Sequence, residues 1–332
     1  MISHGDRGIV YRAEELALQR PVAIKLLLPE FSQDERFRER FRRESRIAAA
    51  IDHPNVLPVF DAGEEGGVLY ITTRLVDGTD LKSMIAADGH VEPARAGRIV
   101  SQVGAGLDAA HARGMLHRDV KPSNVLIARR DHVYLSGFGL AKRADSTGDM
   151  TRHGSVVARA RYLAPEQVRH ERVDARADVY ALGCVLFEAL TGETPFARYR
   201  EGPEALAHVD AQPPAPSERR LDVPREFDEV VRRALAKDPD ERYPSAGDLG
   251  QAALVAAGGL DRASPWSVVG TGDAAPSRAG RLAGSRAALS HATSSDGTPA
   301  ARLDVLRWTI ALAGLVIVAV GMVAALHGIS TL

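Results

Sequence analysis

Cysteine is nearly absent from this sequence, which contains only Cys184 among its 332 residues. A disulfide framework is therefore excluded, and a reducing compartment is favoured. A charge imbalance is also absent, because 42 basic residues face 43 acidic ones and leave a net charge of −1. The total charge thus gives no indication of a nucleic-acid partner. The first residues, MISHGDRG, lack the charged-then-apolar pattern of a signal peptide.

Charge is missing altogether from residues 308–326, which begin with Trp308 and end with Leu326. A helix of that length, rising about 1.5 Å per residue, nearly spans a bilayer core of about 30 Å. A buried soluble helix is the alternative, but the run follows a Gly-, Ala- and Ser-rich stretch typical of a flexible linker. Arg302 and Arg307 precede the run and no Lys or Arg follows it, so the positive-inside rule predicts a cytoplasmic main domain.

An apolar content of 45% supports a buried core, and the N-terminal part shows short β-prone runs between polar turns. These runs read GIVYRAEE, RPVAIKLLL, VLPVFDAG and VLYITTRLV. Between the second and the third, a helix is predicted from about Gln33 to Ile51, beginning with a capping box of Ser32 and Glu35. Its apolar face consists of Phe37, Phe41, Ala48 and Ile51.

Glu44 lies on the apolar face of this predicted helix, where a carboxylate is costly unless it is paired. Lys25, the one charge in the apolar strand VAIKLLL, is the best partner. The alternative is that Glu44 stands at the edge of the face and reaches water. The residues alone favour neither interpretation.

After Asp77 the pattern becomes helical, and ARAGRIVSQVGAGLDAAHARG is predicted to be a helix that ends at Gly114. A polar loop follows, in which Pro122 excludes a helix and which we expect to lie between two short apolar strands. Eight consecutive residues of this loop include four side chains of the types that carry out catalysis: His117, Asp119, Lys121 and Asn124. Catalytic groups gather in loops held by rigid strands, so this cluster predicts an active site.

Several motifs, taken in order, resemble those of protein kinases. HRDVKPSN is similar to the catalytic loop of that family, and VAIK is similar to the strand that carries its ATP lysine. HPNV, LAPEQ, DVYALGCVLFEALTGETPF and KDPDERY extend the resemblance over roughly residues 3–255. The chain resembles the bacterial, eukaryotic-like Ser/Thr kinases, which are often tethered by one membrane helix.

The resemblance implies an α+β fold with two lobes, a small antiparallel β-sheet lobe with one helix and a larger, mainly helical lobe. Together with the composition it predicts five segments: an N-lobe at 1–76 with a truncated first strand, a C-lobe at 77–255, a flexible juxtamembrane linker at 256–307, a transmembrane helix at 308–326 and a short extracytoplasmic tail at 327–332. The protein is expected to cross the inner or plasma membrane once.

The resemblance also implies roles for single residues. Lys25, paired with Glu44, would hold the α- and β-phosphates of ATP. Asp119 would accept the proton of a substrate hydroxyl, Lys121 would steady the transferred phosphoryl group, and Asn124 would bind Mg²⁺. Other positions implied to contact the nucleotide are Gly5, Gly8, Val10, Ala23, the gatekeeper Thr73, and the hinge that runs from Arg74 to Val76.

Four further positions would be structural. Glu166 would pair with Arg242, and Asp178 would brace the catalytic loop. His117 would belong to the spine behind the metal site.

YLSGFGLAK departs from the family at one decisive position. Gly137 stands where the D-F-G motif of kinases has an Asp that binds the metal. Magnesium prefers carboxylate oxygens, and Asn124 is neutral. Ser136 is expected to point away and Asp131 to lie a turn away. Because metal neutralisation of charge is worth several kcal/mol, phosphoryl transfer is expected to be weakened.

Further departures concern the phosphate loop and the activation segment. Ser3 replaces the first glycine of the loop, and the preceding strand is expected to be missing, which would open a gap in the sheet. Ala158 and Arg159 stand where the family usually has Gly-Thr, so substrate docking is expected to suffer. Thr147, Thr151 and Ser155 are candidate phosphorylation sites, because Arg118 beside Asp119 resembles kinases that read a phosphate in this segment. An unmodified polar loop is an equal alternative.

Two functions stay open. The first is a membrane-tethered Ser/Thr kinase in bacterial signalling that transfers the γ-phosphate of ATP to protein Ser or Thr, weakened by Gly137. The second is an inactive pseudokinase that senses nucleotide or acts as a scaffold. An upstream start and a one-base Asp-to-Gly change are a third explanation of the departures. ATP and weakly held Mg²⁺ are the expected cofactors. Protein substrates or scaffold partners and the membrane are the expected partners, and a homodimer stays open.

Overall fold

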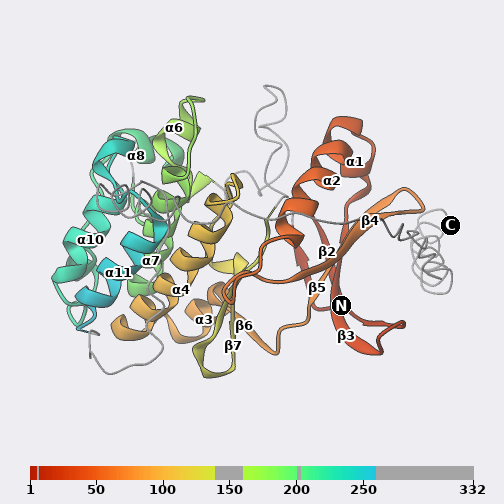
Figure 1. The fold of residues 1–332 in the computed structure, drawn as a ribbon. Helices are drawn as coiled ribbons and strands as arrows, with labels where there is room; N and C mark the ends of the chain where they lie inside the picture. Colours follow the sequence, from red (N-terminus) through yellow and green to blue (C-terminus); the bar gives the residue numbers. More distant parts are fainter. Residues whose placement is uncertain (6, 139–159, 200–202, 259–332) are drawn as a thin grey trace, which may run out of the picture. The chain divides into compact units, whose positions relative to one another are not determined.

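The structure is a computed structural model in which residues 1–5, 7–138, 160–199 and 203–258 are described. They form the expected two lobes, a β-sheet lobe at the N-terminal side and a mainly helical lobe (Figure 1). The expected membrane helix at 308–326 and the tail at 327–332 lie outside the described residues, as does most of the linker. None of the helices within the described ranges is long and apolar enough to cross a membrane.

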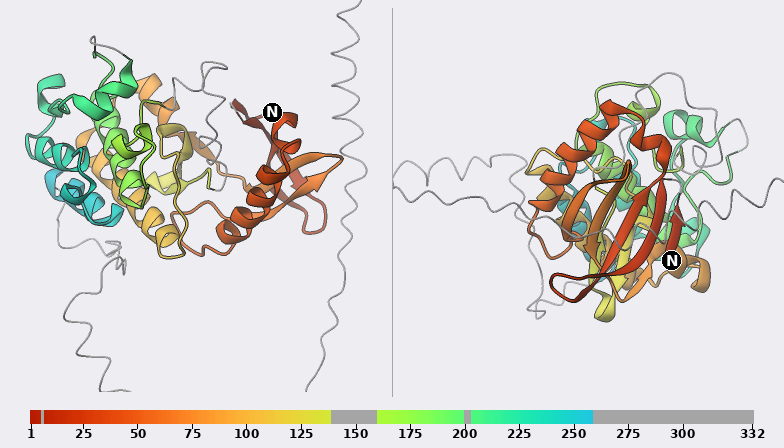
Figure 2. Two further views of the ribbon diagram at one scale, coloured as in Figure 1. Left: turned by 90° about the horizontal axis from the view of Figure 1, so that it is seen from above. Right: turned by 90° about the vertical axis from the view of Figure 1, so that its right-hand side faces the viewer.

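The β-sheet lobe contains a five-stranded antiparallel sheet in the order β1-β2-β3-β5-β4. Its strands are β1 (Ser3–Gly5), β2 (Gly8–Glu15), β3 (Arg20–Leu27), β4 (Val59–Glu65) and β5 (Val68–Arg74). Helices α1 (Pro29–Ser32) and α2 (Glu35–Ala49) cover one face of this sheet (Figure 2). A small core between them contains Leu27, Phe31, Phe37, Phe41, Leu69 and Ile71.

The prediction of a gap in this sheet is wrong. Ser3–Gly5 forms the three-residue strand β1, which pairs with β2 from Ser3 opposite Val10 to Gly5 opposite Gly8. Because β1 is the edge strand, its shortness affects only the edge of the sheet, and every interior strand keeps two neighbours.

The predicted capping box of the N-lobe helix is also wrong. The N-cap of α2 is Asp34, whose carboxylate accepts hydrogen bonds from the backbone N–H groups of Arg36 and Phe37 at 3.0 and 3.2 Å. Ser32 already ends α1, and its hydroxyl oxygen accepts from the N–H of Leu69 at 3.3 Å. The predicted apolar face is present, because Phe37 and Phe41 are only 4% and 1% exposed.

The helical lobe is built around the long helices α4 (Pro93–His111) and α7 (Arg176–Thr191). The remaining α-helices among the described residues of this lobe are α3 (Leu81–Asp88), α6 (Pro165–Val168), α8 (Glu204–Asp210), α9 (Pro216–Arg219), α10 (Glu226–Ala234) and α11 (Ala246–Ala256). Helix α11 packs so closely on α4 that a Cβ on Gly104 would lie 2.4 Å from the carbonyl oxygen of Ala246. Cys184 is fully buried in α7, and this burial raises the pKa of its thiol, as expected of a small core residue.

A second, three-stranded sheet supports the predicted catalytic loop. It consists of β6 (Gly78–Asp80), β7 (Val125–Ala128) and β8 (Val133–Leu135), antiparallel and in that order. The two strands expected on either side of the loop both follow it, because the short apolar segment before the loop is not a strand. The loop therefore enters from α4 and leaves into β7.

Candidate active site

The catalytic loop, residues 117–124, is held from below by Asp178 at the start of α7. This carboxylate is 1% exposed and accepts hydrogen bonds from the backbone N–H groups of His117 at 2.8 Å and Arg118 at 2.7 Å. It also accepts from Nε2 of His111 at 2.8 Å. Burial alone would raise the pKa of Asp178, but the hydrogen bond from His111 and the nearby histidines hold it below its ordinary value.

Arg118 adopts a backbone conformation that this brace makes tenable. Its φ of +61° lies in the left-handed region, which costs a non-glycine residue about 1–3 kcal/mol. Such a conformation persists only where the surroundings enforce it, and the N–H bond to Asp178 does so. The turn at Arg118 directs Asp119 toward the site.

His117 links the catalytic loop to the segment that contains Gly137. Its side chain is fully buried, and burial lowers its pKa, so the ring is neutral. A neutral imidazole has one N–H. Nε2 donates to the carbonyl oxygen of Ser136 at 2.9 Å, while Nδ1 accepts from the N–H of Asp119 at 3.3 Å. The ring also meets Phe138 edge to face at 4.6 Å, so His117 acts here as a structural connector.

Asp119, Lys121 and Asn124, predicted as catalytic and metal-binding residues, lie together. One carboxylate oxygen of Asp119, Oδ2, is 3.1 Å from Nζ of Lys121, and the side chain is 7% exposed. The amide of Asn124 donates to the backbone carbonyl oxygen of Asp119 at 2.7 Å. This arrangement places a carboxylate, a cation and a neutral amide oxygen at one point.

Arg7, which was not predicted as a site residue from the sequence, also reaches this point. It lies in the glycine loop, residues 3–8, and its Nη1 is 3.2 Å from Oδ2 of Asp119. The two residues are 112 positions apart in the chain. A signal for its role was available, because Arg7 is a cation between the two glycines of a phosphate-loop pattern, Gly5 and Gly8.

The residues predicted to surround the nucleotide line one face of the β-sheet lobe. Lys25 lies opposite Val10 on β2 and Ile71 on β5, and Ala23 lies opposite Thr73. Directly opposite residues share a face, and so do residues two apart on a strand. Gly8 is required sterically, because a Cβ at this position would lie 2.0 Å from the carbonyl oxygen of Leu26.

The remaining N-lobe predictions fall on α2 and on the connection to the helical lobe. The Glu44 side chain is 16% exposed and lies within 4.0 Å of the neighbouring Arg43 guanidinium. Arg74 ends β5 and donates to the hydroxyl of Tyr134 on β8 at 2.9 Å, which links the two lobes beside the predicted hinge. Val76 follows, half-buried. A Lys25–Glu44 pair and adenine binding at the hinge stay predictions.

The described residues do not fit a magnesium site. Gly137 has a φ of +93°, and a Cβ built there would point at the Asn124 amide, 3.0 Å from its Cγ. Asp131 is engaged by Arg95 at 2.8 Å, and the hydroxyl of Ser136 donates to the carbonyl oxygen of Asn124 at 3.1 Å. Across the described ranges, no group of three or more His, Cys, Asp or Glu residues could hold a metal ion.

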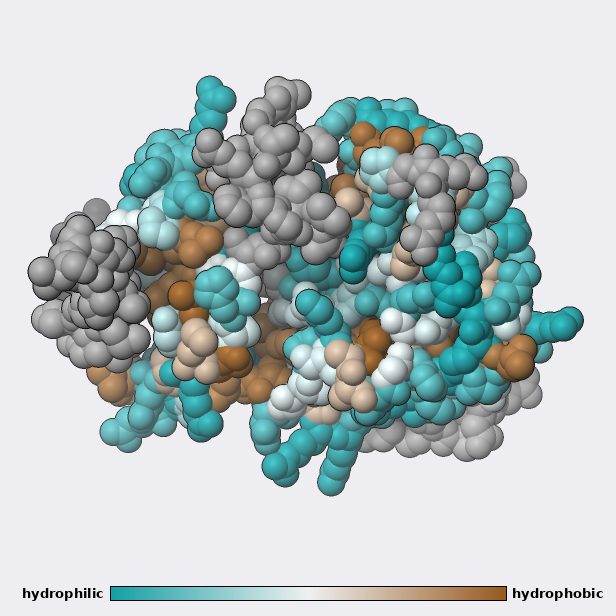
Figure 3. Space-filling view, turned by 180° about the vertical axis from the view of Figure 1, so that it is seen from behind, coloured by the Kyte–Doolittle hydropathy of each residue, from teal (hydrophilic) through white to brown (hydrophobic). Residues whose placement is uncertain are grey.

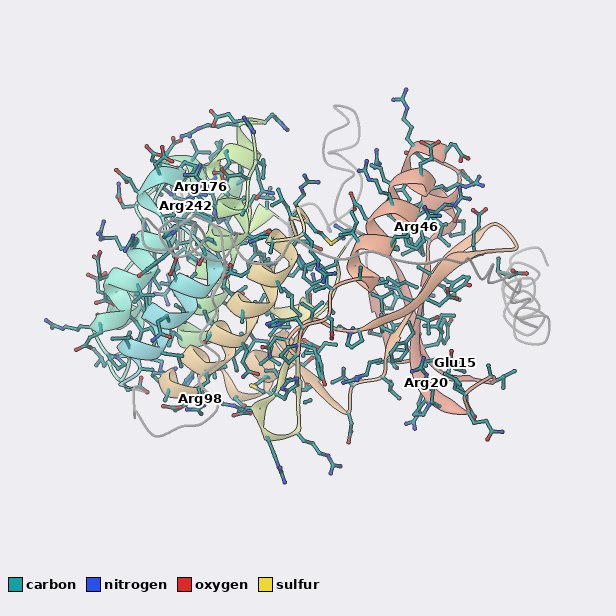
Figure 4. The ribbon with its side chains drawn as sticks, viewed as in Figure 1. Glu15, Arg20, Arg46, Arg98, Arg176 and Arg242 are labelled. Atoms are coloured by element: carbon teal, nitrogen blue, oxygen red, sulfur yellow. The ribbon has the colours of Figure 1, made fainter. Side chains whose placement is uncertain are left out.

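The expected ion pair between Glu166 and Arg242 is present deep in the helical lobe. Both guanidinium nitrogens donate to the two carboxylate oxygens at 2.8 Å, and the side chains are 5% and 0% exposed. Arg242 also donates to the carbonyl oxygen of Arg176 at 3.0 Å, and both arginines are labelled in Figure 4. The pair ties the segment after the activation region to the base of the lobe.

Some predicted residues fall outside the described ranges. The candidate phosphorylation sites Thr147, Thr151 and Ser155, and the departures at Ala158 and Arg159, all lie within residues 139–159. Their roles stay predictions.

Comparison with known proteins places this site in context. The family model described as the protein kinase domain matches residues 1–252. The chain is 45% identical over 253 residues to "Serine/threonine-protein kinase PknH" of Mycobacterium bovis, covering 76% of this chain and 42% of the relative. It is 42% identical over 265 residues to "Serine/threonine-protein kinase PknE" of Mycobacterium tuberculosis, covering 79% and 46%. The chain thus spans less than half the length of these curated relatives.

A solved structure is similar over most of its length. The crystal structure of the Mycobacterium tuberculosis PknI kinase domain matches with a TM-score of 0.63 and 33% identity, covering 77% of this chain and 94% of that one. At this identity the likeness agrees with the two-lobed fold described above.

Proposed function

The chain belongs to the protein kinase family, and from this premise we propose that it is a membrane-tethered Ser/Thr protein kinase weakened by Gly137. The family uses ATP and Mg²⁺ and acts on protein substrates. The observation that carries the proposal is the placement of Asp119 and Lys121, 3.1 Å apart, on a catalytic loop braced by Asp178. Relatives named as serine/threonine-protein kinases support the choice of hydroxyl substrate.

The geometry supports defined roles for these two residues. Asp119 orients a serine or threonine hydroxyl and accepts its proton as the oxygen attacks the γ-phosphorus, the bond to the bridging oxygen breaks and ADP leaves. Lys121 lies where it can stabilise the negative charge of the transferred phosphoryl group. Phosphoryl transfer depends mainly on the positioning of the reacting groups and on charge stabilisation. The described residues retain the groups that position the reactants.

The loss of charge stabilisation supports the proposal that phosphoryl transfer is weakened. In this family a divalent cation, when bound, neutralises phosphate charge, and Gly137 offers no carboxylate to hold it. Asn124 is the remaining predicted ligand; its N–H₂ group donates to the carbonyl oxygen of Asp119, and its amide oxygen could offer a cation only a neutral ligand. We therefore expect slow transfer by the chain as it stands.

Two matched substitutions test this proposal. Gly137→Asp supplies the carboxylate, whereas Gly137→Asn has nearly the same shape and the same strain at a positive φ but no charge. Both residue types tolerate the left-handed region better than most. We expect Gly137→Asp to raise magnesium-dependent autophosphorylation at least about tenfold, or about 1.4 kcal/mol of barrier, while Gly137→Asn stays near the wild type. A wild type as fast as Gly137→Asp would contradict the proposal.

The second function, an inactive pseudokinase that senses nucleotide or acts as a scaffold, is favoured by one observation. Arg7 occupies the Asp119 oxygen that a substrate hydroxyl would need, at 3.2 Å. If Gly137→Asp gains no transferase activity although the protein binds ATP, the pseudokinase explanation replaces the enzyme. The nucleotide-induced shift in melting temperature, measured with and without magnesium, supplies the binding result.

Membrane tethering rests on the uncharged run at 308–326 and on the arginines that precede it. The segments proposed around it are a kinase domain at 1–76 and 77–255 and a linker at 256–307. Fractionation of cells that express the full chain tests this. We expect the protein in the membrane fraction, resistant to high-salt extraction, and we expect deletion of residues 308–332 to release it. Release of the full chain by salt would contradict a membrane-spanning helix.

A further inference from the structure

The Arg7 guanidinium has one nitrogen in an ion pair and a second one without a hydrogen-bond partner in the described part of the chain. The side chain is 13% exposed, Nη1 contacts Asp119, and Nη2 is buried without a hydrogen-bond acceptor among the described residues. A guanidinium carries five N–H donors in a planar fork, and a buried donor without an acceptor is unfavourable. Arg7 therefore carries an unsatisfied donor beside its contact with Asp119 of the catalytic loop.

Phosphate is the chemistry that matches this donor. Arginine binds phosphate oxygens with two parallel N–H bonds, and a second cation, Lys121, lies on the same Asp119 oxygen at 3.1 Å. Lys25 adds a third cation on the sheet face that the glycine loop borders.

Formal charges show what Arg7 can replace. An Asp at position 137 with one Mg²⁺ would contribute a net +1 beside the phosphates. Gly137 together with the Arg7 guanidinium also contributes +1. We propose that Arg7 binds the phosphate groups of ATP in place of a divalent cation, so that this chain binds ATP without metal. The inference rests on the proposed ATP site and deepens it by naming the group that holds the phosphates.

Binding measurements on the full chain test the proposal. Dissociation constants are measured for ATP and for adenosine, each in excess EDTA and in millimolar Mg²⁺. We expect wild-type affinity for ATP to change less than about threefold between the two conditions. Arg7→Gln is expected to weaken ATP binding in EDTA about tenfold or more, while adenosine binding changes less than about twofold, because adenosine has no phosphate.

Controls separate a specific loss from a general one. Arg36→Gln removes the same charge from an exposed position in the first turn of α2, and we expect it to leave both affinities unchanged. Arg7→Lys keeps the charge but loses the fork and should fall between the wild type and Arg7→Gln. In Gly137→Asp with Mg²⁺, the effect of Arg7→Gln should shrink, because the metal then supplies the cation.

The outcomes distinguish this inference from the proposed function. ATP binding only with Mg²⁺, or an Arg7→Gln variant that binds ATP in EDTA like the wild type, overturns the inference and leaves the kinase proposal standing. Metal-free, Arg7-dependent ATP binding without any gain of activity in Gly137→Asp upholds the inference and favours the pseudokinase. A wild type that binds neither ATP nor adenosine overturns both.

Discussion

The two sides of the catalytic loop are held in different ways. We call the side of the helical lobe, with Asp178, Glu166 and Arg242, the lower half of the site, and the side of the glycine loop, with Arg7, the upper half. Below the catalytic loop, the charged residues Asp178, Glu166 and Arg242 are all buried, and each makes several hydrogen bonds. Above it, β1 is an exposed three-residue edge strand, and the glycine loop reaches the catalytic loop through the Arg7–Asp119 pair. On the face shown in Figure 3, hydrophobic residues gather over the β-sheet lobe, whereas the visible surface of the helical lobe is mostly hydrophilic.

This difference explains how chemistry can change without loss of the scaffold. The shape of the catalytic loop is set from below, by backbone N–H groups bound to a carboxylate on α7. Gly137 lies on the opposite side, where the phosphates and their counter-charge would be. Losing a carboxylate there removes an electrostatic contribution but no support of the loop. The two halves can therefore be tested separately, first by breaking the lower one.

The largest effect is expected from Glu166→Ala. It leaves the Arg242 guanidinium, 0% exposed, without its carboxylate, and an uncompensated buried charge costs about 3–5 kcal/mol. Urea denaturation followed by circular dichroism measures the loss. Glu229→Ala is the control, because it breaks an ion pair of the same type whose side chains are 64% and 65% exposed. Equal losses in the two variants would show that the buried pair is not special.

A smaller loss is expected from Asp178→Asn. The side chain keeps its size but loses the charge that accepts two backbone N–H groups and His111, which reduces the unfolding free energy by about 1.5–3 kcal/mol. Arg118 is then free to leave its positive φ. Hydrogen exchange at the amides of residues 117 and 118 should become much faster, whereas the exposed control Asp222→Asn should leave it unchanged. Unaltered exchange in Asp178→Asn would contradict the brace.

The lower half is also the half that the sequence predicted well. Pro122, the apolar β7 strand and four polar side chains within eight residues indicated a rigid loop, and the resemblance supplied Asp178 as its brace. These signals are local or are carried by motifs. The start of α2 was mispredicted because Ser32-x-x-Glu35 and Asp34 are both acceptable caps in isolation, and only the preceding turn of α1 decides between them.

The upper half depends on contacts between distant segments. Arg7 meets Asp119 across 112 positions, and this contact requires both lobes to be folded and closed. No periodicity or spacing encodes such an approach. The position of β1 at the sheet edge was likewise fixed by pairing with β2 rather than by composition, which is why the predicted gap did not appear.

A pH series sharpens the comparison, because buried titratable groups support the lower half. Burial, and then the charge of Lys237, lowers the pKa of His208 to about 3. Between pH 6.5 and that value the unfolded chain binds the proton and the folded protein does not. Stability therefore falls as the pH falls, by about 1.4 kcal/mol per unit for this group. The hydroxyl of Tyr180 lies 2.9 Å from Nδ1 of His208. The amide of His208→Gln can donate to this hydroxyl or accept from it but does not titrate, so the substitution should flatten the slope between pH 6.5 and 5. The measured quantity is the difference in slope between the wild type and His208→Gln. The raised pKa values of Asp108 and Glu188 change stability in the opposite direction, but they do so in both proteins. Parallel slopes would contradict the assignment to His208.

The smallest effect on stability is expected in the upper half, from Arg7→Gln. Removing one partner of a buried ion pair is usually severe because the other charge is left uncompensated. Here Lys121 stays 3.1 Å from the same Asp119 oxygen, and the substitution also removes the unsatisfied donor at Nη2. We therefore expect the unfolding free energy to change by less than about 1 kcal/mol, within the range of ordinary substitutions.

Urea denaturation of Arg7→Gln beside Glu166→Ala compares the two losses of unfolding free energy directly. A loss at Arg7 as large as that at Glu166 would mean that the contact between the glycine loop and the catalytic loop stabilises the fold, and that its primary role is not to hold phosphate.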